Sequence, residues 1–228
     1  GVITDSGAIA VTGLGSFNAN NGASDVTFDF GVTTFGSIGA TGAIVTLSET
    51  DATVLANVTA TTFNLTSVGT ITQTAGSSVL VSGTTTVANG ANDVTLNNAT
   101  NDFGTVTFTT TTGNVTLRDR SALVLGGSGA LASLTVTTAG DLTQTGAIAV
   151  TGATNLNTGA FDTTLTNAGN EFTGVVNVAN SRNSSITDVT ALSLGTVVST
   201  LSITANAGTG ITIDSLTAGT TISLTTVA

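Results

Sequence analysis

Leu142-Thr-Gln-Thr-Gly-Ala-Ile-Ala-Val-Thr-Gly152 is the third copy of one phrase in this 228-residue sequence. The first copy is Ile3-Thr-Asp-Ser-Gly-Ala-Ile-Ala-Val-Thr-Gly13, and a slightly longer second copy runs from Ile71 to Gly83. A fourth begins at Ile211. Such self-similarity is typical of repeat architectures, in which a unit cannot bury its own apolar side and stacks on copies of itself.

The copies are separated by a super-repeat of about 69 residues. Phe35, Phe103 and Phe172 recur at the same step. The sequence therefore predicts one continuous domain over residues 1–228. Its super-repeats cover about residues 1–69, 70–140 and 141–209, with a truncated fourth from residue 210.

A shorter mark lies inside the super-repeat: a branched or apolar residue followed directly by threonine. Its steps range from about 19 to 27 residues and average about 23, the size of one supersecondary unit. The marks are Ile3-Thr4, Val26-Thr27, Val45-Thr46, Ile71-Thr72, Val94-Thr95, Val115-Thr116, Leu142-Thr143, Thr163-Thr164, Ile186-Thr187 and Ile211-Thr212.

The segments around these marks are short, β-branched and bounded by Gly or Asn, as strands are. No segment has a 3.6-residue apolar period, so we expect almost no helix. The pattern predicts a right-handed parallel β-solenoid of about ten coils of about 23 residues. In each mark the branched residue points inward and the Thr outward, and the three phenylalanines fill the core every third coil.

The alternative fold is a row of small β-sandwiches of about 70 residues each. A sandwich gives no reason for the short units to resemble one another, and the usual Trp or Tyr core anchors are missing. The solenoid is therefore favoured.

Composition excludes several classes of function. The chain has 13 acidic residues against three arginines, a net charge of −10, and no Lys, His, Cys or Tyr. Such a chain repels nucleic-acid phosphates and anionic lipid. No apolar run is long enough for a transmembrane helix, so we expect no membrane insertion. Without His, Cys, Lys or Tyr, a Ser or Thr nucleophile lacks its usual basic partner.

Three stretches carry a family resemblance: residues 140–152, residues 91–104, and Asn114-Val-Thr-Leu-Arg-Asp-Arg-Ser-Ala-Leu-Val-Leu-Gly126. They resemble the repeat region of filamentous-haemagglutinin-like proteins, which are very large bacterial surface or secreted proteins, often adhesins. The resemblance covers essentially the whole chain. It implies a stalk on an extracellular protein at the bacterial cell surface.

An acidic column just before the marks is the main candidate for chemistry: Asp25, Asp93, Asn114, Asp141 and Asp162. If the last four lie on consecutive coils, Asp141 and Asp162 are about 4.8 Å apart, which suits a Ca²⁺ site or the paired carboxylates of a polysaccharide-active β-helix enzyme. The favoured interpretation is that these residues begin strands by accepting backbone N–H bonds.

Arg118 and Arg120 flank Asp119, so both arginines point outward and Asp119 points the opposite way. They suit either an anionic ligand or, as favoured here, ordinary surface salt bridges.

Thr-x-Thr pairs raise a further alternative, because paired Thr columns on β-solenoids can bind ice. Such pairs do not recur in every coil, and charged residues lie beside the Thr column. The pairs are Thr72/Thr74, Thr107/Thr109, Thr135/Thr137 and Thr143/Thr145.

We therefore expect no catalytic activity and no cofactor beyond a possible Ca²⁺. The sequence favours a structural stalk or fibre that supports adhesion or cell–cell contact. Neither terminus resembles a cap, so the expected partners are further repeats or end-to-end copies of the chain, together with cell-surface glycans or proteins.

Overall fold

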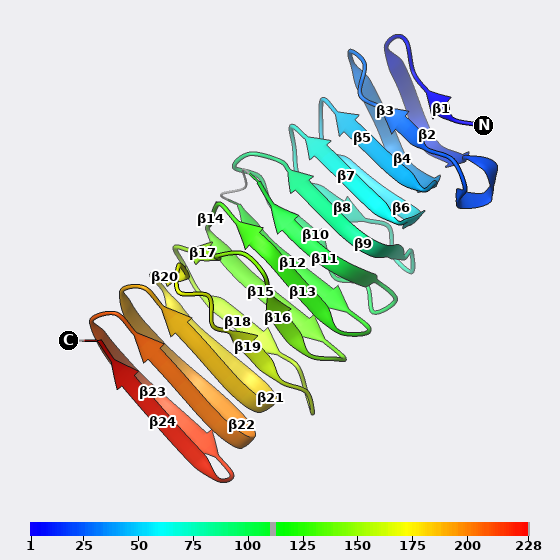
Figure 1. The fold of residues 1–228 in the computed structure, drawn as a ribbon. Coiled ribbons are helices and arrows are strands. Elements are labelled where there is room, and N and C mark those ends of the chain that lie inside the picture. The colour runs from blue at the N-terminus through cyan, green and yellow to red at the C-terminus, as the bar shows by residue number, and fades with distance from the viewer. Residues whose placement is uncertain (110–112, 228) are drawn as a thin grey trace.

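The chain folds as a parallel β-solenoid of about 12 turns with a spacing of about 19 residues (Figure 1). The computed structural model describes residues 1–109 and 113–227. Strand pairings in the described part of the chain are parallel, so the tandem-sandwich alternative is wrong. Its one helical element is the short 3₁₀ turn η1, Asn20–Gly22. No helix in the described ranges has the length and hydropathy needed to cross a bilayer.

The strands of the first half are β1 Ile3–Thr4, β2 Ile9–Asn18, β3 Val26–Phe28, β4 Thr33–Thr41, β5 Ile44–Glu49, β6 Thr53–Ala60, β7 Thr62–Ser67, β8 Ile71–Gln73, β9 Val79–Ala88, β10 Val94–Leu96, β11 Asp102–Phe108 and β12 Asn114–Asp119. Those of the second half are β13 Leu123–Ser128, β14 Ala130–Leu131, β15 Ser133–Thr138, β16 Leu142–Gln144, β17 Ala149–Val150, β18 Thr154–Asn157, β19 Thr163–Leu165, β20 Glu171–Phe172, β21 Val175–Asp188, β22 Ala191–Ala207, β23 Gly210–Ala218 and β24 Thr221–Thr226.

Each turn contributes to two broad faces. Face A contains β1, β3, β5, β7, the second halves of β9 and β11, β13, β16, β19, the second halves of β21 and β22, and β24. Face B contains the second halves of β2 and β4, β6, β8, β10, β12, β15, β18, the first halves of β21 and β22, and β23.

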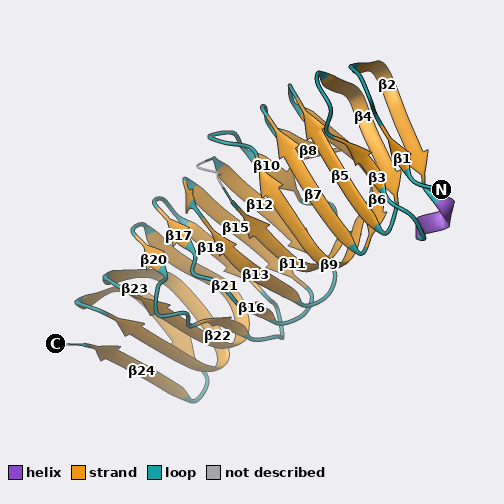
Figure 2. Cartoon of the chain, turned by 45° about the horizontal axis from the view of Figure 1, so that its top comes forward, coloured by secondary structure: helices purple, strands orange, loops and turns teal. Residues whose placement is uncertain are grey.

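The chain passes from face A to face B at one edge of the rod, the A-to-B edge, and returns at the opposite B-to-A edge. Most loops gather along these edges (Figure 2). Short strands also lie there, such as β14, β17 and β20, which form a small three-stranded sheet.

One super-repeat occupies about three and a half turns. On face A, Ile3 pairs with Val26, Val26 with Val45, and Val45 with Phe63, which completes three turns. The second super-repeat begins half a turn later, at Ile71 on face B. Leu142 lies again on face A, and Ile211 again on face B.

The predicted ten coils of about 23 residues are therefore wrong in number and length. Marks within one super-repeat lie one turn apart on one face. The steps from Val45 to Ile71, from Val115 to Leu142 and from Ile186 to Ile211 change face and include an extra half turn. Counting each step as one coil gave too few turns and too long a spacing.

The core runs along the whole rod between the two faces. The first residues of the eight internal marks, from Val26 to Ile186, are at most 1% exposed, whereas their threonines are half-buried on the outer surface. Ile3 and Ile211, in the outermost marks, are themselves half-buried. The inward and outward directions predicted for the marks are confirmed.

The recurring phenylalanines fill the core, as predicted, but at every three and a half turns. Phe35, Phe103 and Phe172 are at most 4% exposed. Phe35 also packs against Phe17 and Phe28, with ring centroids 5.7 and 5.8 Å away. The Phe17–Phe35 contact is edge-to-face, a geometry that stabilises a core beyond the area it buries.

We predict that Thr85→Val stabilises the rod. Thr85 is fully buried on face A between Phe63 and Val106, and its hydroxyl has no hydrogen-bond partner. Replacing the unpaired hydroxyl by a methyl group of similar size should raise the free energy of unfolding by about 1–2 kcal/mol, measured by urea denaturation.

The matched control is Thr86→Val, at the neighbouring outward position, which should change stability little. A stabilisation at Thr86 equal to that at Thr85 would show that β-propensity, and not the buried hydroxyl, is responsible.

Candidate functional site

Each super-repeat contains one buried carboxylate that accepts the N–H of its core phenylalanine. The Phe35 N–H donates to Glu49 Oε1 at 2.9 Å, and the Phe103 N–H donates to Asp119 Oδ2 at 2.6 Å. The Phe172 N–H donates to Asp188 Oδ2, also at 2.6 Å. These three acidic side chains are at most 2% exposed. They join each phenylalanine to the turn that follows it.

The second oxygen of two of these carboxylates closes a local turn. Asp119 Oδ1 accepts hydrogen bonds from the N–H and the hydroxyl of Ser121, and Asp188 Oδ1 accepts the same pair from Thr190. Burial raises the pKa of Asp119, although the N–H bonds from Phe103 and Ser121 act in the opposite direction. Burial likewise raises the pKa of Glu49.

A buried amide pair recurs in the second and third super-repeats. Gln73 Nε2 donates to Asn101 Oδ1 at 3.0 Å, and Asn101 Nδ2 donates back to Gln73 Oε1 at 2.8 Å. Gln144 and Asn170 form the same reciprocal pair at 2.7 and 2.9 Å. Both asparagines are fully buried and also accept a backbone N–H from the preceding turn, of Val79 or Ile148.

The first super-repeat replaces this pair with Asp5 and Thr33. Asp5 accepts the loop N–H groups of Asp29 and Phe30. The buried hydroxyl of Thr33 has no partner. The amide pair is thus a structural device, and its loss leaves an unpaired polar atom in the core.

The predicted acidic column is divided between the two edges. Asp93 and Asn114 lie at the A-to-B edge, whereas Asp25, Asp141 and Asp162 lie at the B-to-A edge. The expectation that Asp93, Asn114, Asp141 and Asp162 occupy four consecutive coils is wrong, because the half turn between super-repeats moves the column to the other edge.

The favoured interpretation of this column is confirmed in an altered form. The four aspartates each accept a backbone N–H, but the donor is on the next turn, whereas Asn114 accepts the Ser133 hydroxyl there. Asp93 Oδ1 accepts the Asn114 N–H at 2.7 Å, and Asp25 Oδ1 accepts the Ile44 N–H at 3.0 Å.

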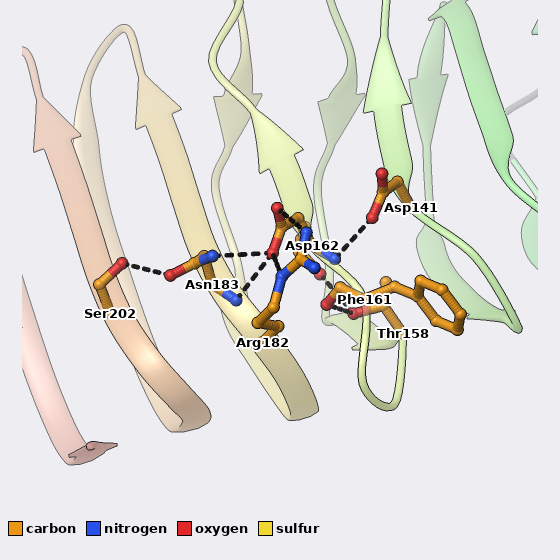
Figure 3. Close-up of polar contacts among 8 residues, drawn as sticks. Asp141, Thr158, Phe161, Asp162, Arg182, Asn183 and Ser202 are labelled. Atoms are coloured by element: carbon orange, nitrogen blue, oxygen red, sulfur yellow. Dashed lines mark hydrogen bonds and ion pairs between the residues drawn. The ribbon is translucent and has the colours of Figure 1, made fainter. Parts of the chain in front are cut away.

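Asp141 and Asp162 do lie on adjacent turns, in a chain of polar contacts (Figure 3). The Asp162 N–H donates to Asp141 Oδ1 at 2.9 Å. Arg182 holds the Asp162 carboxylate with two hydrogen bonds, Nε to Oδ1 at 2.8 Å and Nη2 to Oδ2 at 2.6 Å. Asn183 donates to Asp162 Oδ1 and accepts from the Ser202 hydroxyl. Hydrogen bonding from Arg182 lowers the pKa of Asp162.

This arrangement is poorly suited to bind a cation or to supply the two catalytic carboxylates of a glycosidase. A guanidinium already neutralises Asp162, and no group of three or more acidic side chains able to hold a metal ion occurs in the described part of the chain. Paired carboxylates in glycoside hydrolysis act as an acid and a base or nucleophile, which an ion-paired Asp162 is poorly placed to do.

Arg118 and Arg120 both point outward, and an ion pair involves Arg120. Both side chains are exposed, and Asp119 between them points into the core, as predicted. Arg120 forms an ion pair with Asp102 on the preceding turn, at 2.7 Å. Hydrogen bonding from Ser121, ahead of that from Arg120, lowers the pKa of Asp102.

The Thr-x-Thr pairs are divided between the faces. Thr72 and Thr135 lie on face B, while Thr107 and Thr143 lie on face A. On face B, Thr72 and Thr135 belong to one column with Thr95 and Thr116 between them. The pairs therefore build no double column along a single face.

We predict that Asp119→Asn destabilises the rod and flattens its pH dependence. An amide nitrogen facing the Phe103 N–H removes an acceptor from a buried donor, which should cost about 1–3 kcal/mol. Because burial raises the folded pKa of Asp119 above its usual value of 3.8, its contribution to stability is complete below that value and is lost as pH rises through the folded pKa.

The measurement is urea unfolding as the pH rises from about 4 to neutrality, a range in which the lowered pKa values of Asp102 and Asp162 leave both carboxyls ionised. The exposed Asp29→Asn is the control for the loss of one negative charge. If the free energy of unfolding of Asp119→Asn changes with pH as steeply as that of the wild type, the Asp119 carboxyl does not titrate as described.

We also predict that Ca²⁺ leaves the melting temperature of the protein within about 1 °C of its value in Mg²⁺, since a ligand stabilises only a state that binds it. The comparison uses differential scanning calorimetry with each cation in excess. A calcium-specific rise of several degrees that Asp141→Asn removes would establish a site at Asp141 and Asp162.

Comparison with known proteins identifies a family of repeats. No curated protein and no solved structure matches this chain. A family model matches twice in succession, over residues 41–110 and 112–179, which is more than half of the chain. Each match has the length of the super-repeat, in a different phase from the boundaries drawn above. The chain belongs to the family described as repeats of unknown function (DUF5649).

Proposed function

We propose that this chain is a structural segment, a stalk or fibre, of a long extracellular bacterial surface or secreted protein. One observation carries the proposal: the side chains best suited to chemistry form hydrogen bonds between successive turns. Asp119, Asp162 and Asn101 each join neighbouring turns in this way. Such bonds hold successive turns together along a rod.

The geometry of the rod supports the same role. About 12 turns at the strand spacing of about 4.8 Å give a length of roughly 57 Å. The core is continuous along that length, and a net charge of −10 favours solubility of an elongated surface. Each added super-repeat extends the rod without a new kind of contact.

The surface location and the adhesive role rest on the resemblance to filamentous-haemagglutinin-like repeats. Cell-surface glycans or proteins are the partners that this resemblance suggests. Other parts of a longer protein would then supply recognition, and the solenoid would set their distance from the cell.

If the chain is a structural rod, the number of super-repeats should determine the length of the rod. A variant with residues 71–141 duplicated in tandem should form a rod longer by about three and a half turns, roughly 17 Å, in electron micrographs or small-angle scattering. Its unfolding should remain cooperative, because the duplicated unit meets the same neighbours.

An unchanged length or a collapsed particle would contradict the spacer role. An enzymatic role has a separate test, which is hydrolysis of polysaccharides by the wild-type protein. Activity that Asp141→Asn abolishes would replace this proposal.

A further inference from the structure

A groove of about 580 Å³ runs along the B-to-A edge of the N-terminal half. Six successive turns line it, each with one short segment. The residues that represent those turns are Gly22, Gly42, Thr61, Ser82, Gly104 and Ala122.

Successive turns lie close together at the glycines that line the groove. A Cβ atom on Gly104 would lie 2.5 Å from the Gly83 carbonyl oxygen, and one on Gly42 would lie 3.0 Å from the Ser24 carbonyl oxygen. A side chain at either position would press against the backbone of the preceding turn. One end is walled by η1, where Asn20, Asn21 and Gly22 all have positive φ angles.

The opposite, A-to-B edge carries a short loop beside the middle of the groove. Residues 89–93 connect β9 on face A to β10 on face B at that edge (Figure 1). In chain order the loop lies between Ser82 and Asp102, two residues that line the middle of the groove. The half-turn offset of the super-repeat places equivalent loops on alternate edges. For this reason the 89–93 loop lies on the edge opposite the groove.

The loop and the groove are also compatible in size and charge. Gly90 and Ala91 at the tip are exposed and small, and Gly90 has a φ of 58°, which keeps the turn tight. Asp93 at the loop's end is exposed. Arg120, one of only three cationic residues in the chain, pairs with Asp102, which lines the groove, and the Arg120 side chain remains 54% exposed.

We propose that two copies of this solenoid pack side by side, with the 89–93 loop of one copy seated in the groove of the next. The contact joins two different surfaces, so it can repeat and build a flat row of parallel rods. The inference rests on the fold and does not depend on the proposed stalk function. The net charge of −10 opposes association, so the contact is expected to be weak in dilute solution.

A disulfide trap tests the contact, because the natural chain has no cysteine. The variant carries Ser82→Cys in the groove and Ala91→Cys in the loop, both at exposed positions. Within one copy the strand of face A separates these sites by roughly 20 Å, beyond the roughly 7 Å limit of a disulfide. Mild oxidation should therefore give a ladder of linked dimers, trimers and larger species on non-reducing gels.

The matched control combines Ser82→Cys with Ala160→Cys. Ala160 follows a glycine in the equivalent loop of the third super-repeat, but that loop lies at the same edge as the groove. This control and each single variant should give at most dimers. Circular dichroism of the reduced proteins checks that all variants keep the β-solenoid.

A second variant tests the charge contribution. Arg120→Gln in the Ser82/Ala91 cysteine background should slow ladder formation several-fold while leaving the melting temperature almost unchanged, since exposed ion pairs contribute little to stability. Ladders of equal yield in the control pair, or no products beyond dimers in the folded test variant, would overturn the proposal.

Discussion

Parallel stacking at a spacing of about 4.8 Å is the constraint on which this structure depends. Each residue lies directly above and below a registered partner, as Val94 lies between Ile71 and Val115. A side chain must therefore suit two neighbours of known identity as well as the core or the solvent. Branched residues satisfy this demand inside the rod, and Thr or Asn satisfies it outside.

The same constraint explains how polar groups enter the core. An inward polar side chain is costly unless a neighbouring turn offers a partner. Asp119 accepts the N–H of Phe103, and Asn101 pairs with Gln73, so each of these groups has a partner on another turn. Where the pairing is incomplete, as at Thr33, the structure retains a buried hydroxyl without a partner. Hydrogen bonds between turns thus allow polar side chains to occupy the core.

Periodicity alone predicted the solenoid, the near absence of helix, the inward and outward directions of the marks and the burial of the phenylalanines. It failed on the number of turns, because Ile71 has the same local sequence as Ile3 although it lies on the other face. Local similarity records which neighbours a residue needs and does not record the face on which it meets them. The inward direction of Asp119 was predicted, but its hydrogen bond was missed for a related reason: the donor, the Phe103 N–H, is 16 residues away on the previous turn. An acidic residue 14 or 16 residues after each core phenylalanine was the available clue.

Because each super-repeat ends with an extra half turn, the orientation of the chain that follows depends on whether the number of repeats is odd or even. Gain or loss of one whole unit by recombination would keep the core intact, since every joint still meets its usual neighbour. It would also rotate everything downstream by half a turn, so that a loop facing one partner would face away from it. Gain or loss of two units would restore the original orientation. Selection on a surface that must face one direction would therefore act on repeats in pairs, whereas selection on length alone would accept any number.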